Sequence, residues 1–492
     1  MGSRPFVRTL PAQTHESQRR VELGGKVTSL ETRPSGEVPF QETEGTAQSV
    51  EIGMYASENI SFLLVQEQLK RFQNMKLNIN SPVKEIQFQS VDQTHIPLGG
   101  RLREFLSNWQ KITTDPKILE YVKGYVMEFM ENPVQNWEIR APKFSKSENI
   151  CISTEINEML KKGAIELVNN PTPDQVLSHL FVRPKKNGGM RPILNLKSLN
   201  KFVKYQHFKM EGFQSVKNTI QRGDWMCTLD LKDAYFCIPI HDSHKKYLRF
   251  SHEGIIYQYK SLPFGLGSGP RTFTKIMKPI VGILRRIGVR LIIYLDDILI
   301  LNQNKEGLIK DRNKLVWLLH HLGWLINWEK SVTVPTQVLD YLGMTINSIE
   351  MKIYLPERKI QGIVQKCQTI LSNDKCSIHE LASLIGMLTA TAEAVIPASL
   401  YVRELQMTKT KFLLHNPNYQ TLVTMPTECR VEIRWWIHHL RLWNGKHIIT
   451  PGPDLILETD ASLKGWGASC PTLNQKSSRM GGSWVLKKRD FT

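Results

Sequence analysis

The sequence predicts an α+β fold, because strand-like and helical patterns share the same stretches of the chain. From about residue 146 to 350, short β-prone segments are mixed with helical ones, and beyond Pro356 helical patterns dominate. Strand-like residues return after residue 451. At 492 residues the chain is too long for a single hydrophobic core, so we expect several domains.

The N-terminal part differs from the rest in composition. Residues 1–95 are rich in Ser, Thr, Glu, Gln and Gly without a sustained apolar period, which predicts a largely disordered tail with one helix around Glu58–Phe72. Residues 96–145 predict a helical extension, with helices over Arg101–Trp109 and Ile118–Phe129. The predicted division of the remaining chain is 146–350 for the mixed part, 351–450 for the helical part and 451–492 for the last strands.

The chain carries a formal net charge of +18, which favours a polyanionic partner, either nucleic acid or an anionic membrane surface. It has no uncharged apolar run long enough to span a membrane, no signal peptide and no basic amphipathic helix. We therefore expect an intracellular protein that binds nucleic acid and no membrane. No signal chooses between cytoplasm and nucleus or fixes the oligomeric state. The seven cysteines form no Cys-x-x-Cys pair, so neither a zinc site nor a disulfide framework is predicted.

Two adjacent carboxylates, Asp296 and Asp297, interrupt the apolar run Leu291–Leu301. Apolar runs of this length predict two buried strands joined by a tight turn. Buried ionised carboxylates cost several kcal/mol each unless a positive charge meets them, so we expect a divalent cation at this turn. An acidic surface turn is the alternative, because Asp favours turns in any case.

A third carboxylate, Asp230, lies in the β-prone segment Trp225–Ile240, at or near the end of a strand. Mg²⁺ prefers oxygen ligands and is usually held by one or two carboxylates plus substrate phosphates. One Asp from this strand and two from a neighbouring hairpin could hold two ions about 4 Å apart, the spacing used for in-line phosphoryl transfer.

Three further segments accompany the carboxylates. Leu180–Leu196 predicts a hairpin whose tip could grip a triphosphate, although an ordinary solvated tip has the same pattern; its basic residues are Arg183, Lys185, Lys186 and Arg191. Leu262–Pro270 is a Gly/Pro-rich loop before the helical run Arg271–Leu284, and its glycines let the backbone approach a ligand. Tyr341–Ile346 predicts a short strand after the helix Leu308–Leu322.

The order of these motifs resembles that of retroelement reverse transcriptases. The basic hairpin is followed by Leu-Asp-Leu-Lys-Asp-Ala-Tyr, Leu-Pro-Phe-Gly-Leu, Tyr-Leu-Asp-Asp and Tyr-Leu-Gly, over roughly residues 146–350. Within that family the chain is most similar to the DIRS-like retrotransposons, relatives of the gypsy class, and Gly99–Ile112 resembles the segment that precedes the polymerase there. The resemblance implies a right-hand polymerase with fingers, palm and thumb, in which helices back an antiparallel palm sheet.

The resemblance implies a metal-binding role for the acidic residues. Asp230 and Asp296 would bridge two Mg²⁺ ions, for which Mn²⁺ is a possible substitute, and Asp297 would assist as a third carboxylate. The backbone carbonyl of Leu231 would complete the site of the ion that accompanies the nucleotide.

The resemblance also implies how a nucleotide would be held. Tyr235 would act as a steric gate that leaves no room for a 2′-hydroxyl, although a core Tyr with a satisfied hydroxyl is the alternative. One of the two tip lysines, with Arg191, would hold the β- and γ-phosphates, and the Phe264 ring would stack on the nucleotide or template. The implied nucleotide-binding residues are Lys185, Lys186, Arg191, Leu231, Asp233, Ala234, Tyr235, Phe264 and Gly265, and the implied primer grip is Tyr341, Leu342 and Gly343.

The end of the chain resembles the opening of a ribonuclease H domain, and Asp460 matches the first carboxylate of such a site. A two-metal nuclease needs further acids on later elements, yet only Asp490 follows. We therefore expect an incomplete ribonuclease H fold without that activity. Either the element's reading frame is broken or the chain is a fragment of a longer product.

The predicted function is RNA-directed DNA polymerisation, with an RNA template, a DNA template-primer duplex and dNTPs as partners. An RNA-dependent RNA polymerase shares the palm and the Asp-Asp hairpin, but a bulky residue at position 235 argues against it. A catalytically impaired or domesticated nucleic-acid-binding module is the alternative from another class. It predicts the loss of a catalytic Asp, whereas all three are present.

Overall fold

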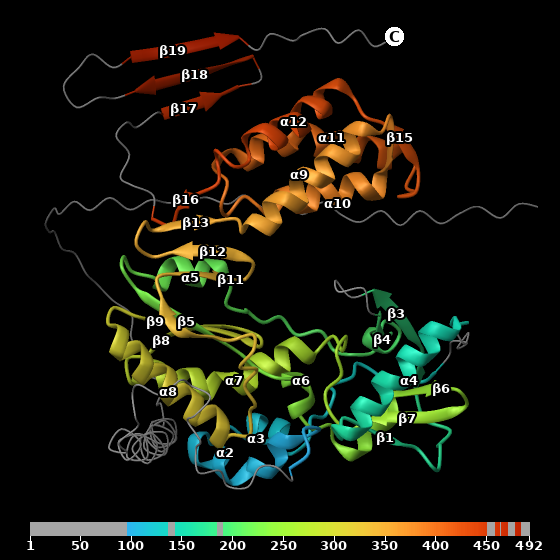
Figure 1. The fold of residues 1–492 in the computed structure, drawn as a ribbon. Coiled ribbons are helices and arrows are strands. Elements are labelled where there is room, and N and C mark those ends of the chain that lie inside the picture. The colour runs from blue at the N-terminus through green and yellow to red at the C-terminus, as the bar shows by residue number, and fades with distance from the viewer. Residues whose placement is uncertain are drawn as a thin grey trace, which may run out of the picture. The chain divides into compact units, whose positions relative to one another are not determined.

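The computed structural model describes residues 96–135, 143–184, 190–449, 458–462, 464–470 and 478–483. The predicted tail over 1–95, with its helix at 58–72, lies outside the described residues, as do Lys185 and Lys186. The predicted α+β class is confirmed, because helices and mainly antiparallel sheets are mixed along the chain (Figure 1).

The central sheet has four antiparallel strands in the order β10-β5-β9-β8. Its strands are β5 (Trp225–Asp230), β8 (Arg290–Tyr294), β9 (Asp297–Asn302) and β10 (Val332–Thr336). Successive strand residues point to opposite faces. Ile298 and Ile300 therefore enter one hydrophobic core, and Leu299 and Leu301 enter a second. Burial on both faces explains why the sequence of this hairpin is an almost continuous apolar run.

Helices cover the two faces of this sheet. The first core is completed by α7 (Gly269–Arg286) and α8 (Lys305–His321), which contribute buried residues such as Phe273 and Leu315. On the opposite face lie α5 (Phe213–Thr219) and the elements that follow the sheet in sequence, including buried Trp436. The three strands β5, β8 and β9 are therefore largely buried on both faces, whereas β10 is a partly exposed edge strand.

A second group of strands and one long helix is built from segments on both sides of β5 in the sequence. Its sheet has the order β1-β7-β6-β2, and a separate hairpin pairs β3 with β4. Helix α4 begins with a capping box in which Ser145 and Glu148 exchange hydrogen bonds. The element bounds are α4 (Lys146–Lys161), β1 (Ile165–Leu167), β2 (Leu177–Ser178), β3 (Leu180–Pro184), β4 (Met190–Leu194), β6 (Arg249–His252) and β7 (Ile255–Tyr259).

The extension contains η2 (Arg101–Phe105), α2 (Leu106–Ile112) and α3 (Pro116–Lys123). The helix predicted over Ile118–Phe129 is wrong in its second half, because it ends at Lys123. Beyond Gly124 the chain pairs with distant segments, through isolated bridges from Tyr125 to Ile240 and from Phe129 to Val203. The extension is also tied to α8, since the fully buried Trp109 donates its Nε1–H to the carbonyl of Leu322 at 3.0 Å.

The strand predicted over Tyr341–Ile346 is also wrong. The chain instead forms a hairpin of β11 (Val338–Tyr341) and β12 (Met344–Asn347), joined by Leu342 and Gly343. Both turn residues have positive φ, 47° and 75°, which is the pattern of a type I′ turn. This hairpin continues into β13 (Lys352–Tyr354) and β16 (Lys446–His447) as a sheet ordered β11-β12-β13-β16.

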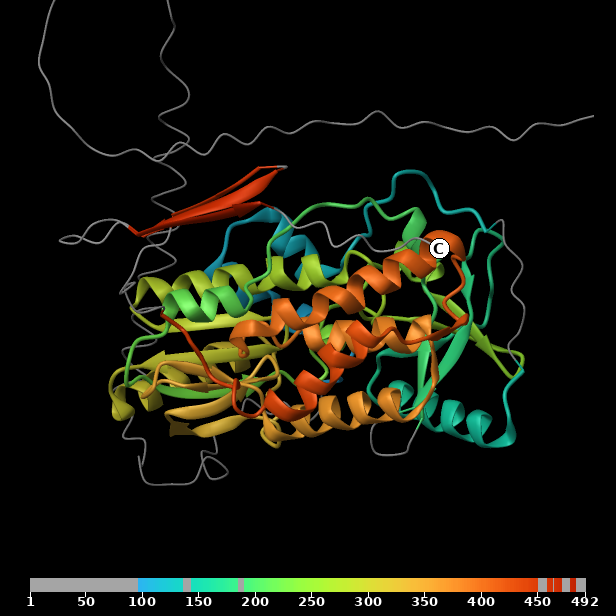
Figure 2. The same ribbon diagram turned by 90° about the horizontal axis from the view of Figure 1, so that it is seen from above.

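Four helices follow, packed side by side in Figure 2 as α9 (Glu357–Ser372), α10 (Ile378–Thr389), α11 (Arg403–His415) and α12 (Thr427–His439). Helix α10 begins with a capping box in which Ser377 and Glu380 exchange hydrogen bonds. The first turn of α11 has no local side-chain cap. Glu432, buried on α12, accepts the backbone N–H groups of Glu404 and Leu405 at 2.9 and 3.1 Å instead.

Smaller elements complete the described residues. The last is an antiparallel sheet of β17 (Glu458–Ala461), β18 (Gly465–Cys470) and β19 (Ser478–Ser483). In the parts of the chain that the structure describes, no helix combines the length and apolar character needed to cross a membrane. The remaining elements are η3 (Leu199–Lys201), α6 (Ala234–Cys237), η4 (Asp242–Tyr247), β14 (Lys375–Ser377), η5 (Ile396–Val402) and β15 (Leu422–Thr424).

The cap between two helices gives a test of the helical part. Glu432→Ala removes the carboxylate that receives two N–H groups of α11, so we expect the free energy of unfolding in urea to fall by about 2 kcal/mol. Glu428→Ala removes an exposed carboxylate from the same helix and should change it by less than about 0.5 kcal/mol. Equal effects of the two substitutions would contradict the capping role of Glu432.

Candidate functional site

The β8–β9 turn presents two of the predicted carboxylates at the end of the central sheet. Tyr294 pairs with Asp297 across the hairpin, so only Leu295 and Asp296 form the turn. Leu295 has a φ of 53°, whereas Asp296 does not have a positive φ, which is the type II′ pattern. Gly is favoured at the first central position of that turn, and a left-handed Leu there costs about 1–2 kcal/mol. The turn is strained at the point where its carboxylates emerge.

The third carboxylate lies directly beside the other two. Asp230 is the last residue of β5 and pairs in register with Asp297, the first residue of β9. The next residue, Leu231, donates its backbone N–H to the carbonyl of Asp296 at 3.0 Å. The structure therefore brings Asp230, Leu231, Asp296 and Asp297 together, although Asp230 and Asp296 lie 66 positions apart in the sequence.

Crowding of like charges perturbs this cluster. Burial, followed by the charges of Asp296 and Asp230, raises the pKa of Asp297 to about 6. Burial also raises the pKa of Asp230, with Asp296 adding to the effect and Lys330 opposing it. The Lys330 ammonium lies 4.0 Å from an oxygen of Asp230 but is largely exposed. The local negative charge is thus only weakly compensated by the protein itself.

The chemistry of these donors fits a hard divalent cation, because all of them are oxygens and the charge is in excess. Among the described residues, no group of three His, Cys, Asp or Glu side chains is already gathered into a metal cage. Mg²⁺ usually takes one or two carboxylates and completes its octahedron with water and substrate phosphates.

Asp230 is also held by the segment before β10, whose residues the sequence analysis did not identify. Its backbone N–H donates to Ser331 Oγ at 3.0 Å, and its carbonyl accepts the N–H of Asn327 at 2.8 Å. Lys330 belongs to the same segment. The sequence offers only a polar stretch before β10, and an isolated lysine in such a stretch is usually solvated.

Tyr235 lies beside the carboxylates in an aromatic stack. Its ring is stacked between Phe264, with centroids 5.0 Å apart, and Phe273, with centroids 5.6 Å apart. Burial raises the pKa of the Tyr235 hydroxyl, and the nearby charge of Asp296 adds to the rise. A Cβ atom on Gly269 would come within 3.0 Å of the Tyr235 ring, so this ring position depends on a glycine at the start of α7.

The other predicted nucleotide-binding residues occupy the rim of the same site. Phe264 is 55% exposed, which leaves one face of its ring accessible. Gly265 has a φ of 93°, and its carbonyl accepts a hydrogen bond from the Asn200 side chain at 2.8 Å. Asn200, which sequence analysis missed, also accepts the N–H of Gly267 and so clamps the loop. Asp233 carries an ion pair to Lys162 at 2.9 Å.

The structure also gives the positions of further residues that the sequence analysis named. Ala234 is buried at the start of α6. On the basic hairpin, the backbone of Arg191 lies in β4 opposite Arg183. Tyr341, at the end of β11, donates its hydroxyl to the carbonyl of Asp297 at 3.2 Å, which links the predicted primer grip to the carboxylates. Asp460 lies in β17 opposite Gly467.

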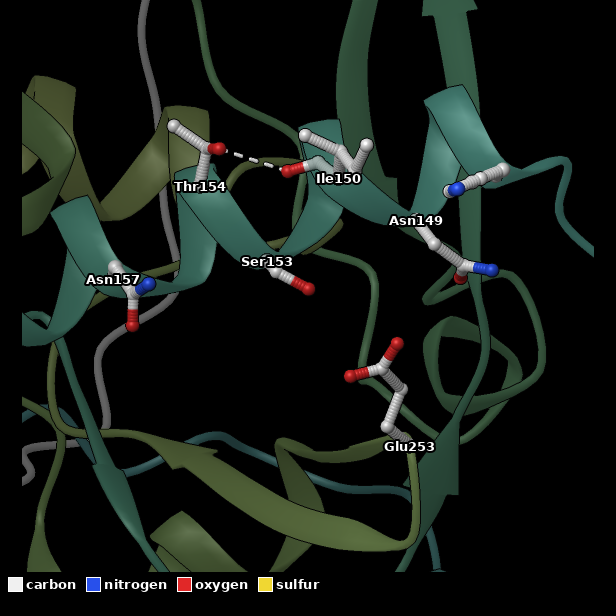
Figure 3. A pocket seen from close by; sticks show the side chains of 7 residues that line it. Asn149, Ile150, Ser153, Thr154, Asn157 and Glu253 are labelled. Atoms are coloured by element: carbon white, nitrogen blue, oxygen red, sulfur yellow. Dashed lines mark hydrogen bonds between the residues drawn. The ribbon is translucent and has the colours of Figure 1, made fainter.

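A cavity also lies away from the carboxylates. It has a volume of about 560 Å³ between α4 and the β6–β7 turn (Figure 3), lined by Lys146, Asn149, Ile150, Ser153, Thr154, Asn157 and Glu253. Ser153 Oγ lies 3.0 Å from Nε2 of His252, and Glu253 approaches the same nitrogen at 4.0 Å. A catalytic relay needs the acid on the opposite ring nitrogen, so these residues do not form one.

The raised pKa of Asp297 has a measurable consequence in the absence of divalent cations. Its ordinary pKa is 3.8 and its folded value is about 6, so its contribution to stability is present at low pH and is lost as the pH rises through about 6. Asp297→Asn removes that dependence. Urea unfolding with a chelator should show the variant gaining stability over the wild type between about pH 4 and about pH 7. A stability difference that stays constant over that range would contradict the raised pKa.

Comparison with known proteins agrees with this geometry. Residues 183–346 match the family model described as "Reverse transcriptase (RNA-dependent DNA polymerase)". Two transposon polyproteins of Schizosaccharomyces pombe, Tf2-3 and Tf2-7, are 26% and 25% identical to the chain over 241 residues. Each match covers 49% of this chain and 17% of the polyprotein, so the chain spans a small part of the length of these curated relatives.

Solved structures of the foamy viral protease-reverse transcriptase share the fold. The complex with dsDNA has a TM-score of 0.55 at 19% identity and covers 74% of this chain and 72% of that chain. The complex with RNA/DNA hybrid has a TM-score of 0.55 at 16% identity, covering 79% and 50%. Residues 183–346 are therefore similar to reverse transcriptase domains of transposon polyproteins, and the fold is shared with the foamy viral enzyme.

Proposed function

We propose that the chain is an RNA-directed DNA polymerase that transfers deoxynucleotides to a primer 3′-hydroxyl. The observation that carries this proposal is the juxtaposition of Asp230, Asp296 and Asp297 at one end of the central sheet, within the reverse transcriptase domain. Two strand ends and a two-residue turn hold these side chains, so the protein needs little reorganisation to bind cations there.

Asp230 and Asp296 are the proposed ligands of two Mg²⁺ ions, with Asp297 and the carbonyl of Leu231 as auxiliary oxygens. When bound, the ions lower the pKa of the primer 3′-hydroxyl and neutralise charge on the triphosphate and the departing pyrophosphate. The protein fixes the carboxylates through the β5–β9 register and through the N–H of Leu231 on Asp296. Mn²⁺, which also prefers oxygen ligands, is the expected substitute.

Tyr235 is the proposed sugar gate, because its ring is held in an aromatic stack next to Asp296 and cannot easily swing away. The accessible face of Phe264 is suited to stacking on a base or sugar. The backbone at Asp233 and Ala234, together with Arg191 and the hairpin-tip lysines 185 and 186, is proposed to receive the triphosphate.

The proposed macromolecular partners are an RNA template and the growing template-primer duplex. The foamy viral enzyme that shares this fold was solved with dsDNA and with RNA/DNA hybrid, and the net charge of +18 favours a polyanion. The turn at Leu342 and Gly343 is proposed to contact the primer, and the helices α9–α12 to form the thumb.

The finer classification is part of the same proposal. We assign the chain to DIRS-like elements on the motifs described above, with residues 146–350 as fingers and palm and 351–450 as the thumb and connection. We interpret residues 451–492 as the opening of a ribonuclease H domain, marked by Asp460, without that activity in this chain.

Primer extension tests the catalytic carboxylates. Asp296→Asn keeps the shape of the side chain but removes the charge, so we expect dNTP incorporation on an RNA template with Mg²⁺ to fall by at least about 10²-fold. Asp340→Asn, on the exposed surface of β11, is the matched control and should retain incorporation. If folded wild-type protein binds RNA but incorporates nothing, the chain is a nucleic-acid-binding module instead.

Sugar selection tests Tyr235. Tyr235→Ala opens the space in which the ring now lies between Phe264 and Phe273, so ribonucleotide incorporation should rise relative to deoxynucleotide incorporation. Tyr235→Phe keeps the ring and should keep the selectivity. The measurement is the ratio of kcat/KM for a dNTP to kcat/KM for the matching rNTP. Equal ratios in the wild type and the Ala variant would show that Tyr235 is a core residue without a gating role.

A further inference from the structure

The helix that carries Tyr235 cannot hold its own orientation. Helix α6 has only four residues, Ala234–Cys237, and its N-cap Asp233 is strained, with a φ of 48° and no side-chain cap. A single turn of helix is far below the length at which helices are stable in water. The position of the Tyr235 ring must therefore be imposed by neighbouring segments. Phe264 and Phe273 stack on the ring itself.

The back of α6 is held by the N-terminal extension. Gly100 donates its backbone N–H to the carbonyl of Phe236 at 2.8 Å. Further along the extension, Tyr125 donates its N–H to the carbonyl of Pro239 at 2.7 Å. These two hydrogen bonds fix the backbone just after Tyr235 at two points. The extension therefore contacts the helix of the proposed gate while being far from it in sequence.

Gly99 anchors the extension to the end of helix α4. Its N–H donates to the carbonyl of Lys162 at 2.8 Å. A Cβ atom at position 99 would lie 2.0 Å from the carbonyl oxygen of Gly163 and 2.6 Å from the nitrogen of Ala164, so no side chain fits. Gly100 has a φ of 73°, which also favours glycine. Both residues are thus required as glycine for close backbone contact.

The same α4 terminus reaches α6 by a second route. The Lys162 ammonium pairs with Asp233 at 2.9 Å, and Asp233 in turn accepts the N–H of Phe236 at its carbonyl. Lys162 therefore receives Gly99 through its backbone and holds the start of α6 through its side chain. The extension, the end of α4 and the gate helix form one connected unit.

We propose that the pair Gly99–Gly100 and Lys162 are positioning residues that set the depth of Tyr235, so that the N-terminal extension determines sugar selection. The inference rests on the proposed function and deepens it. A side chain at position 99 pushes the extension away from α4 and draws Gly100 off the Phe236 carbonyl. Without that hydrogen bond, helix α6 shifts away from the nucleotide site. The Tyr235 ring then leaves room for a 2′-hydroxyl.

The test uses the full chain and measures primer extension on an RNA template with Mg²⁺. The readout is the ratio of kcat/KM for a dNTP to kcat/KM for the matching rNTP. Partial unfolding lowers both terms equally, so the ratio is insensitive to the fraction of active protein. The variants are Gly99→Ala, which inserts the steric wedge, and Lys162→Met, which removes the ion pair to Asp233 without a backbone clash.

A matched control is available in the helical part of the chain. Gly445 has a φ of 130°, and a Cβ atom there would lie 2.6 Å from the Tyr354 ring, so Gly445→Ala is strained in a similar way but touches neither α6 nor the extension. We expect the dNTP-to-rNTP ratio to fall by about tenfold in Gly99→Ala and in Lys162→Met and to stay at the wild-type value in Gly445→Ala.

Each outcome decides between the possibilities. An unchanged ratio in both test variants, or in Lys162→Met alone when Gly99→Ala does not fold, overturns the positioning role while leaving the polymerase intact. A fall of equal size in Gly445→Ala overturns it as well, because the effect would then be a general result of destabilisation. Wild-type protein that incorporates neither nucleotide overturns the proposed function and this inference with it.

Discussion

The pairing of β5 with β9 is the interaction on which the rest of the site depends. It sets Asp230 opposite Asp297, and the carbonyl of Asp296 then accepts the N–H of Leu231. A slip of one residue would turn every side chain of β9 to the wrong face. Because Ile298 and Leu299 enter different hydrophobic cores, such a slip would expose or misplace both sets of apolar residues. The cores therefore fix the positions of the carboxylates.

This arrangement works against stability at the site itself. The pKa of Asp297 is raised to about 6 because burial and two neighbouring acids disfavour its charge, and Leu295 holds a backbone conformation that suits glycine. Cations that bind the charged cluster relieve the repulsion, so binding and stability are linked. The position of Tyr235 also depends on other segments. Its four-residue helix contacts an aromatic ring of α7 and accepts a hydrogen bond from the N-terminal extension.

The predictions were correct where an element depends on contacts between residues close in sequence, and wrong where it depends on contacts with distant residues. The β8–β9 hairpin was predictable, because an apolar run with a central polar turn is a local signal. The helix predicted over Ile118–Phe129 ended early because Tyr125 pairs with the distant Ile240. The strand predicted over Tyr341–Ile346 contained a turn, because Leu342 adopts a positive φ. A leucine does not normally indicate that conformation.

The sequence by itself determined the α+β class, the identity of the three aspartates and the order of the motifs around them, since these depend on local pattern and residue chemistry. Only the tertiary structure decided what surrounds them. Lys330 beside Asp230, Asn200 across the glycine loop and Gly100 behind Phe236 all act between segments far apart in the chain. Such contacts depend on how the segments pack against shared cores, and no local pattern encodes that packing.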